Sequence, residues 1–248
     1  MCYNVSVSIE GSILRERFNA EFGEIKHFKP IYHASAFSLP FLPVVTNQAP
    51  GKIQLFQWGL IPGWVKDEGS AEQIRLHTLN ARAETIRSRS AFRPLIKKKR
   101  CLILVDGFYE WREVNRQKYP YYIFLKERDP FALAGIWDTW INMKTHEIHS
   151  TFSVITTQAN TLLSKIHNTT KRMPVVLTLK QEKEWLRNDV SPQTIDSLLH
   201  PREDPRLTAH PITKLITTRG ANKNTPEVMR EHHYKELEET TTEPAGRK

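Results

Sequence analysis

The stretch RCLILVDGFYEW, residues 100–111, has the composition of β-structure, because branched aliphatic and aromatic side chains follow one another almost without a break. Five further runs of this kind occur along the chain, bounded by Gly, Pro, Asn or Asp. They are CYNVSVSI (2–9), YPYYIFL (119–125), FALAGIW (131–137), TFSVITT (151–157) and RMPVVLT (172–178). These runs predict that strands dominate the fold.

Helical patterns interrupt the strands irregularly. They occur in SAEQIRLHTLNARAETIR (70–87), ANTLLSKIH (159–167), LKQEKEWLRN (179–188) and SPQTIDSLLH (191–200). Ser191 is the expected N-cap of the last helix, with Pro192 at its first position. We therefore expect an α+β fold: a single domain, residues 1–229, with a mostly antiparallel, barrel-like β-sheet and peripheral short helices. Residues 230–248 are poor in apolar side chains and are predicted to form a flexible C-terminal tail.

Composition places the chain among globular proteins. It has 248 residues, of which 39% are hydrophobic and 10% aromatic. Its longest apolar runs are too short to cross a membrane, and it does not open with a charged-then-apolar leader. Two cysteines cannot build a disulfide framework, so a reducing, cytoplasmic setting is expected. A monomer is the default expectation.

The charge is strongly positive. Lys and Arg number 36 against 27 Asp and Glu, which gives a net charge of +9. Eight of these basic residues lie between Arg82 and Arg100, where Glu84 is the one acid. This density favours a polyanionic partner, most simply nucleic acid, although a solvated basic face is a common alternative. Sequence signals for a phosphate loop or a nucleophile elbow are missing, and the two histidines of HEIH (146–149) lack a third metal ligand nearby, so we predict neither a metal nor a cofactor.

The chain begins MCYN, with one of its two cysteines at position 2. If Met1 is removed, the α-amino group and the thiol of Cys2 stand on neighbouring carbons as a 1,2-aminothiol. The plainer reading is a small apolar residue in a first strand. The position alone leaves both readings open.

Five motifs in a fixed order identify a family. They are MC at the start, WGLIPGW (58–64), NARAET (80–85), VDGFYEW (105–111) and IHNTTKRMPVVL (166–177). Together they resemble the SRAP family of SOS response-associated peptidases, or abasic-site processing proteins. The resemblance extends from Cys2 to about Met229.

The resemblance implies a sensor of abasic sites in single-stranded DNA that loses Met1 and bonds to the damaged sugar through its new N-terminal cysteine. It implies four catalytic positions, namely Cys2 as nucleophile with Asn80, Glu110 and His167. It also implies that Arg82 contacts a phosphate, that Trp64 lies by the DNA path, and that Pro40 wedges near the lesion.

The chemistry of these residue types suits that reaction. An amine and a thiol on adjacent carbons capture an aldehyde first as a Schiff base and then as a five-membered thiazolidine. An α-amino pKa of roughly 7.7–8.0 leaves a neutral fraction near pH 7. His167 is suited to moving protons at the sugar, Glu110 to positioning the amine, and Asn80 to orientation. The Schiff base also permits β-elimination, a weak abasic-site lyase activity. The same residues are suited to removing Met1, which a cellular methionine aminopeptidase could equally do.

Each residue also has a structural alternative. Glu110 can pair with an arginine, His167 can cap a helix, Asn80 can be an N-cap, and Trp64 can belong to the core. Arg82, Arg93 and Arg172 are the phosphate-binding candidates, because single-stranded DNA is held by cations and stacking.

Two departures from the family pattern concern the site. The family commonly opens MCGR, so Tyr3 and Asn4 replace a small residue and an arginine, and residues 168–171 lengthen the segment after His167. Two rival functions stay open: an N-terminal-cysteine hydrolase that acts on amides, and a non-catalytic single-stranded DNA-binding module.

Overall fold

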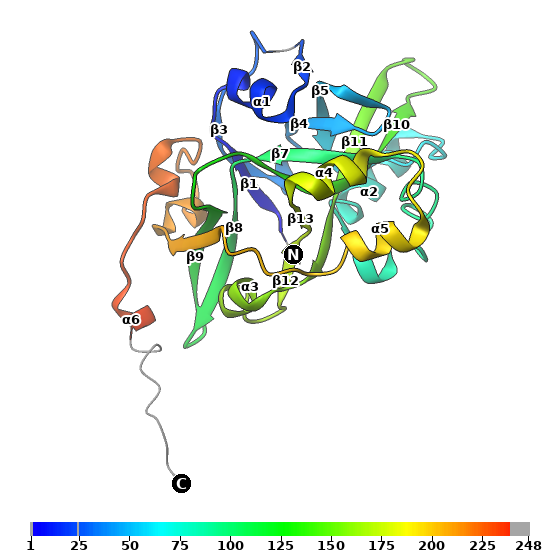
Figure 1. The fold of residues 1–248 in the computed structure, drawn as a ribbon. Helices are drawn as coiled ribbons and strands as arrows, with labels where there is room; N and C mark the ends of the chain where they lie inside the picture. The colour runs from blue at the N-terminus through cyan, green and yellow to red at the C-terminus, as the bar shows by residue number, and fades with distance from the viewer. Residues whose placement is uncertain (1, 24, 239–248) are drawn as a thin grey trace.

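A closed barrel of five strands forms the centre of the molecule (Figure 1). The computed structural model describes residues 2–23 and 25–238. The barrel consists of β4 (Phe41–Thr46), β5 (Ala49–Trp58), β7 (Arg100–Val105), β10 (Phe131–Ile141) and β11 (Ile148–Gln158). Its strands run in the order β11-β10-β7-β4-β5, all antiparallel, and a parallel contact that places Trp58 opposite Phe152 joins β5 back to β11. The expected α+β fold with a mostly antiparallel, barrel-like sheet is therefore confirmed.

Four short strands extend the barrel sheet. They are β2 (Glu21–Phe22), β6 (Asn80–Arg82), β12 (Arg172–Pro174) and β13 (Val176–Leu177). A second, antiparallel sheet has the order β14-β9-β8-β1-β3. Its strands are β1 (Asn4–Val7), β3 (Ile31–Ser35), β8 (Gly107–Val114), β9 (Gln117–Leu125) and β14 (Leu207–Pro211).

The stretch 100–111 connects the two sheets. β7 is buried along its whole length in the barrel, and β8 begins in the second sheet after a single residue, Asp106. The Asp106 carboxylate accepts hydrogen bonds from the Ser6 hydroxyl at 2.6 Å and from the Ser8 backbone amide at 3.0 Å. A Cβ on Gly107 would overlap the Tyr122 ring. The chain can therefore turn between the sheets because a buried acid satisfies the β1 donors and glycine leaves room for the tyrosine.

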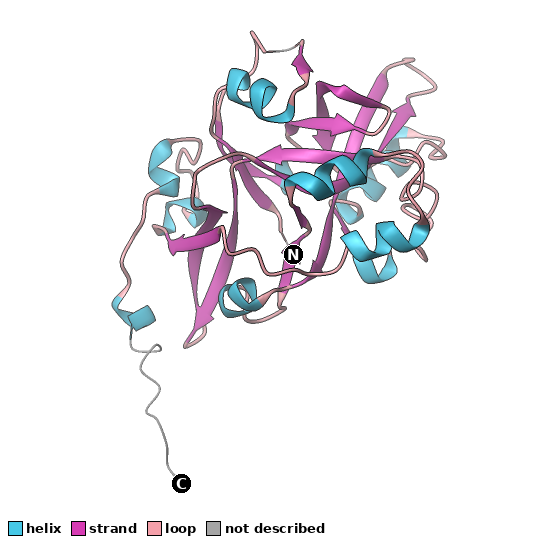
Figure 2. Ribbon diagram, in the orientation of Figure 1, coloured by secondary structure: helices cyan, strands magenta, loops and turns pink. Residues whose placement is uncertain are grey.

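The helices lie outside the strands (Figure 2). They are α1 (Gly11–Phe18), α2 (Glu68–His77), α3 (Thr161–Ile166), α4 (Leu179–Leu186), α5 (Pro192–Leu198) and α6 (Lys235–Glu238), with 3₁₀ turns η1 (Ala36–Ser38), η2 (Ala83–Thr85), η3 (Lys214–Thr217) and η4 (Pro226–Met229). Ser191 caps α5 with Pro192 at its first position, as expected. None of the helices in the described residues is long and apolar enough to cross a bilayer.

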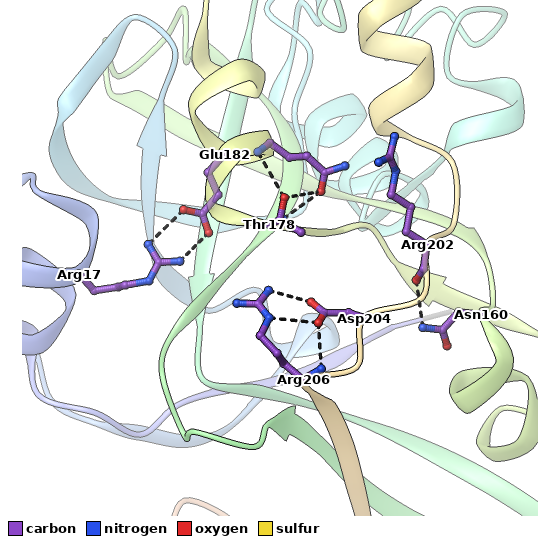
Figure 3. A network of polar contacts seen from close by, with 8 residues as sticks. Arg17, Asn160, Thr178, Glu182, Arg202, Asp204 and Arg206 are labelled. Carbon is purple, nitrogen blue, oxygen red and sulfur yellow. Dashed lines mark hydrogen bonds and ion pairs between the residues drawn. The ribbon is translucent and has the colours of Figure 1, made fainter.

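Polar contacts tie these outer elements together (Figure 3). Arg17 of α1 binds Glu182 of α4 through two hydrogen bonds, at 2.8 and 3.1 Å. Asn160, the N-cap of α3, donates to the carbonyl oxygen of Arg202 at 3.2 Å. Arg206 and Asp204 pair at 2.8 Å where the chain enters β14. These contacts join α1 to α4 and fix the start of α3 to the segment that leads into β14.

The helix-forming composition found in places over residues 70–87 corresponds to a helix only in part. A helix occupies only the first part, because α2 ends at His77 and residues 80–82 form β6 beside β11. Ala81 is fully buried there, and the amide of Val154 donates to the carbonyl oxygen of Leu79. Pairing with β11 therefore overrides the helical propensity of NARAET.

The start of the predicted tail contacts the body of the protein. The Tyr234 hydroxyl donates to the carbonyl oxygen of Ile212 at 2.8 Å, and Leu237 is buried against Val114 and Tyr119. Residues 239–248 lie outside the described residues, and the division of the chain at residue 229 stays a prediction.

Candidate active site

The start of the described chain lies between the two sheets. β1 pairs with β8, with Val5 opposite Phe108 and Ser6 opposite Gly107, and Tyr3 and Glu110 line the same pocket. Cys2 is fully buried, and its carbonyl oxygen accepts a hydrogen bond from the Asn80 amide nitrogen Nδ2 at 2.9 Å. Because Asn80 belongs to β6 of the barrel sheet and β1 belongs to the second sheet, this hydrogen bond joins the two sheets at the start of the described chain.

Glu110 is a buried acid in this site. Its side chain is only 3% exposed, and burial raises its pKa to about 7. The oxygen Oε2 lies 3.4 Å from Nδ1 of His167. The other oxygen, Oε1, has no hydrogen-bond partner within the described part of the chain. A carboxyl group with these properties both accepts and releases a proton near neutral pH.

His167 ends α3 and is buried beside Glu110. Its Nδ1 lies 2.9 Å from the carbonyl oxygen of Arg172, which can only accept, so Nδ1 carries the proton. Its Nε2, 2.8 Å from the Thr170 hydroxyl, therefore accepts from that group. Burial also lowers the pKa of His167, so the ring is neutral at pH 7.

The longer segment after His167 closes back on it. The amide of Lys171 donates to the carbonyl oxygen of His167 at 2.8 Å, and Lys171 adopts a left-handed conformation, with φ 48°. The side chain of Asn168 forms two hydrogen bonds with the backbone of Glu113 on β8. Residues 168–171 therefore anchor the histidine to the strand that carries Glu110.

Asn80 presents one occupied and one unoccupied polar atom. Its nitrogen holds the Cys2 backbone, whereas its oxygen Oδ1 is buried without a hydrogen-bond partner among the described residues. Oδ1 and the unpaired oxygen of Glu110 are acceptors on residues that lie beside Cys2. A buried acceptor without a donor is costly, which is typical of a site that binds something.

A pocket of about 340 Å³ opens beside these residues. It is lined by Tyr3, Asn4, Glu110, Trp111, Glu113, Lys118, His167 and Thr169. A larger hollow of about 750 Å³ lies elsewhere, over β2, β5 and the start of β11, and the four predicted catalytic residues do not line it. Within the described residues, no group of three or more His, Cys, Asp or Glu could hold a metal ion.

Comparisons with known proteins identify the family of this chain. The sequence profile of the family described as SOS response associated peptidase (SRAP) matches residues 1–219. The chain belongs to the SRAP family.

Relatives of this SRAP chain share most of its length. Abasic site processing protein YoqW of Bacillus subtilis is 33% identical over 235 residues, covering 94% of this chain and 100% of YoqW. Abasic site processing protein HMCES of Xenopus tropicalis is 28% identical, covering 84% of this chain and 68% of HMCES. A crystal structure of a protein from Bacteroides thetaiotaomicron matches with a TM-score of 0.87 and 37% identity, covering 94% of this chain and 100% of that one.

The two tryptophans of the SRAP motif WGLIPGW occupy opposite environments. Trp58 is fully buried, and its indole nitrogen donates to the carbonyl oxygen of Leu79 at 2.7 Å. Trp64 is 55% exposed. The amide of Gly63 donates to the Asp138 carboxylate at 2.7 Å, which fixes the backbone immediately before Trp64. Trp64 is therefore a surface residue and not part of the core.

The other nucleic-acid candidates differ in accessibility. Arg82 and Arg93 are exposed, and Pro40 is half-buried, with its carbonyl oxygen bonded to the amide of Trp58. Arg172 is buried, and its guanidinium binds both carboxylate oxygens of Glu84, at 2.5 and 3.0 Å. A phosphate could reach Arg172 only in competition with that ion pair, so the observed contacts give Arg172 a structural role beneath the NARAET turn.

The basic cluster from Arg82 to Arg100 does not form one continuous face. Arg100 is fully buried, and its guanidinium donates to backbone carbonyl oxygens, including that of Trp185 at 2.8 Å. Lys99 pairs with Asp138 at 2.6 Å, and Arg87 pairs with Asp196 at 2.8 Å. Part of the cluster is therefore structural, which the count of charges in the sequence could not distinguish.

Sequence reasoning missed three contributors to the site. The Thr170 hydroxyl donates to Nε2 of His167, and Lys118 near the start of β9 lines the pocket. Asn4 bonds through Oδ1 to Nε2 of His33 at 2.9 Å. None lies in a motif that indicates its role, and only the departure at positions 3 and 4 drew attention to Asn4.

Proposed function

We propose that this SRAP protein recognises abasic sites in single-stranded DNA and bonds covalently to them through Cys2. The observation that carries the proposal is the hydrogen bond from Asn80 to the Cys2 backbone, which holds Cys2 where Glu110 and His167 are in contact. The names of the relatives YoqW and HMCES, abasic site processing proteins, support the same substrate.

The bonding step uses the aldehyde of the open-chain sugar. After Met1 has been removed, the α-amine of Cys2 adds to the aldehyde carbon, and loss of water gives a Schiff base. The Cys2 sulfur then adds to the same carbon while its proton passes to the nitrogen, which closes a thiazolidine. Burial raises the pKa of the Cys2 thiol, so the sulfur stays protonated until the imine is in place.

The surrounding residues move and hold protons. Glu110, with a pKa of about 7, takes a proton from the amine as it attacks and returns one to the departing water. Neutral His167 moves a proton at the ring oxygen when the sugar opens. Asn80 holds the Cys2 backbone and offers Oδ1 to the amine.

Two side reactions follow from the same residues. Removal of Met1 by the chain itself needs one peptide cleavage next to Cys2, with Glu110 and His167 at hand. Met1 lies outside the described residues. β-Elimination from the Schiff base would cut the DNA, and ring closure by the thiol competes with it, so we expect only weak lyase activity.

The DNA path follows the exposed groups near the site. Phosphates are bound by Arg82 and Arg93, and by Lys118 in the pocket. Trp64 stacks on a base, and Pro40 lies near the lesion. One chain supplies Cys2, Asn80, Glu110 and His167, so the reaction needs no second subunit.

A denaturing gel tests the proposal. Purified protein incubated with a single-stranded oligonucleotide carrying one abasic site should give a DNA–protein species that survives denaturation. Cys2→Ala should abolish the stable species but keep an α-amine, so borohydride should still trap its Schiff base. Cys101→Ala, which removes the other buried thiol, is the matched control and should still crosslink. A wild-type protein that never shifts the DNA would overturn the proposal.

The role of His167 has its own test. His167→Ala should slow crosslinking on the order of 100-fold, as expected for loss of a general acid–base group. His149→Ala, on β11 away from the pocket, is the control and should react at the wild-type rate. Equal rates for all three proteins would remove His167 from the mechanism.

A further inference from the structure

An aromatic pair lies beside the reactive residue. The ring of Tyr3, the neighbour of Cys2, packs against the ring of Phe37 in η1, with centroids 4.9 Å apart and planes at 35°. Tyr3 also lines the pocket that contains Glu110 and His167. We call Tyr3 and Phe37 the aromatic shelf.

Backbone contacts hold the shelf in place without a ligand. The amide of Ala36 donates to the carbonyl oxygen of Tyr3 at 2.7 Å, and Asn4 pairs with Ser35 between β1 and β3. The turn that carries Phe37 ends at Leu39 in a left-handed conformation, with φ 51°. Because main-chain hydrogen bonds fix the backbone beneath both rings and the rings pack on each other, ordering them on a ligand costs little conformational entropy.

The shelf remains open to solvent on one side. Phe37 is 64% exposed, which is unusual for a residue of its size that already packs against another ring. Positive charge lies nearby: Arg82 acts on the Tyr3 hydroxyl, opposing the rise in its pKa that burial causes, and Lys118 lines the same pocket as Tyr3. An exposed aromatic surface with cations at its edge has the chemistry that binds single-stranded nucleic acid.

We propose that the aromatic shelf stacks on the base of a nucleotide that flanks the abasic sugar. This inference rests on the proposed function. The abasic nucleotide has no base to stack, so aromatic binding energy near the lesion must come from a neighbour. The shelf makes the protein sensitive to which base stands beside the lesion, with purines preferred over pyrimidines because they offer a larger stacking area.

Binding can be measured apart from bond formation. A tetrahydrofuran analogue of the abasic sugar lacks the aldehyde, so fluorescence anisotropy on such oligonucleotides reports affinity alone. The flanking position, on each side in turn, carries adenine, thymine or a second tetrahydrofuran. On one side, we expect wild-type affinity to fall from adenine to thymine to tetrahydrofuran, by roughly 5- to 20-fold overall.

Substitutions assign the effect to the shelf. Phe37→Ala should lose roughly 5- to 20-fold with flanking adenine and almost nothing with flanking tetrahydrofuran. Tyr3→Phe should bind like the wild type, and Tyr3→Leu should lose the preference. Phe41→Ala is the matched control, because Phe41 is 56% exposed and lines the separate hollow over β5. It should keep the wild-type preference.

The outcomes separate the two proposals. A wild-type affinity that ignores the flanking base on both sides, or a preference that survives Phe37→Ala, would overturn the shelf. Failure to crosslink a natural abasic site would overturn the proposed function instead, and the tetrahydrofuran data would show whether flanking bases still bind.

Discussion

Glu110 shows how one buried residue links the stability of the fold to its chemistry. The strand β8 carries its carboxyl group into a nearly solvent-free position, and one oxygen keeps no partner among the described residues. A pKa of about 7 means that the folded protein holds the proton more tightly than the unfolded chain, whose carboxyl group titrates near 4.5. Stability contributed by this proton is present below pH 4.5 and is lost as the pH rises through 7.

Replacing Glu110 should reveal this loss. The free energy of unfolding of Glu110→Gln minus that of the wild type should rise by on the order of 3 kcal/mol from pH 4.5 to pH 8, because only the wild type loses the proton's contribution. Urea denaturation of both proteins at several pH values measures the difference. Glu113→Gln on the same strand is the control, and an identical pH dependence for wild type and Glu110→Gln would contradict the raised pKa.

At the scale of elements, the junction between β7 and β8 decides where the site forms. β7 belongs to the barrel and β8 to the second sheet, with Asp106 alone between them. Asp106 also binds Ser6 and Ser8, which fixes β1 beside β8 and so fixes the strand that leads to Cys2. A substitution at this junction should therefore alter the position of Cys2 and Glu110, although no residue of the junction belongs to the site.

Gly107 is the most sensitive residue of the junction. A methyl group there would overlap the Tyr122 ring, so Gly107→Ala should destabilise the protein by about 1–3 kcal/mol through overpacking. It should also slow crosslinking by shifting β1 against β8. Gly51→Ala is the control, because a Cβ at Gly51 meets no atom within 4 Å. Chemical denaturation midpoints for the two variants provide the measurement, and equal midpoints would show that the tyrosine ring moves aside freely.

At the scale of the whole molecule, the site lies where the barrel and the second sheet meet. Asn80 comes from a strand added to the barrel, Glu110 from the second sheet, and His167 from the end of α3. Some of the basic residues behind the net charge of +9 form ion pairs within the fold, as Lys99 does, whereas others, such as Arg82 and Arg93, are exposed.

Salt dependence tests which cations bind DNA. Each phosphate contact contributes a slope of about −0.7 to the plot of log affinity against log salt for single strands. Arg82→Ala and Arg93→Ala should each reduce the slope by about that amount. Arg15→Ala, an exposed arginine of α1, should leave it unchanged. Anisotropy titrations between 50 and 300 mM salt measure the slopes, and equal slopes for all four proteins would exclude both arginines.

Much of this protein follows from local sequence. The runs of branched and aromatic residues predict most of the barrel strands, and Ser191–Pro192 predicts the start of α5, because these signals depend on neighbouring residues. The order of five motifs, MC to RMP, identifies the family. The sequence pattern did not predict β4 or β5. Pro43 weakens the strand signal of β4, and the polar residues of APGKIQLFQW weaken that of β5.

The tertiary structure decided the rest. The segment 80–82 is a strand because β11 pairs with it. Arg172 is buried in an ion pair with Glu84. Trp64 is exposed where Asp138 holds the backbone just before it. Cys2, Asn80, Glu110 and His167 meet only when two sheets close around the start of the chain. Their local signals are compatible with helix caps and ordinary ion pairs, and long-range pairing is the physical reason that they form one site.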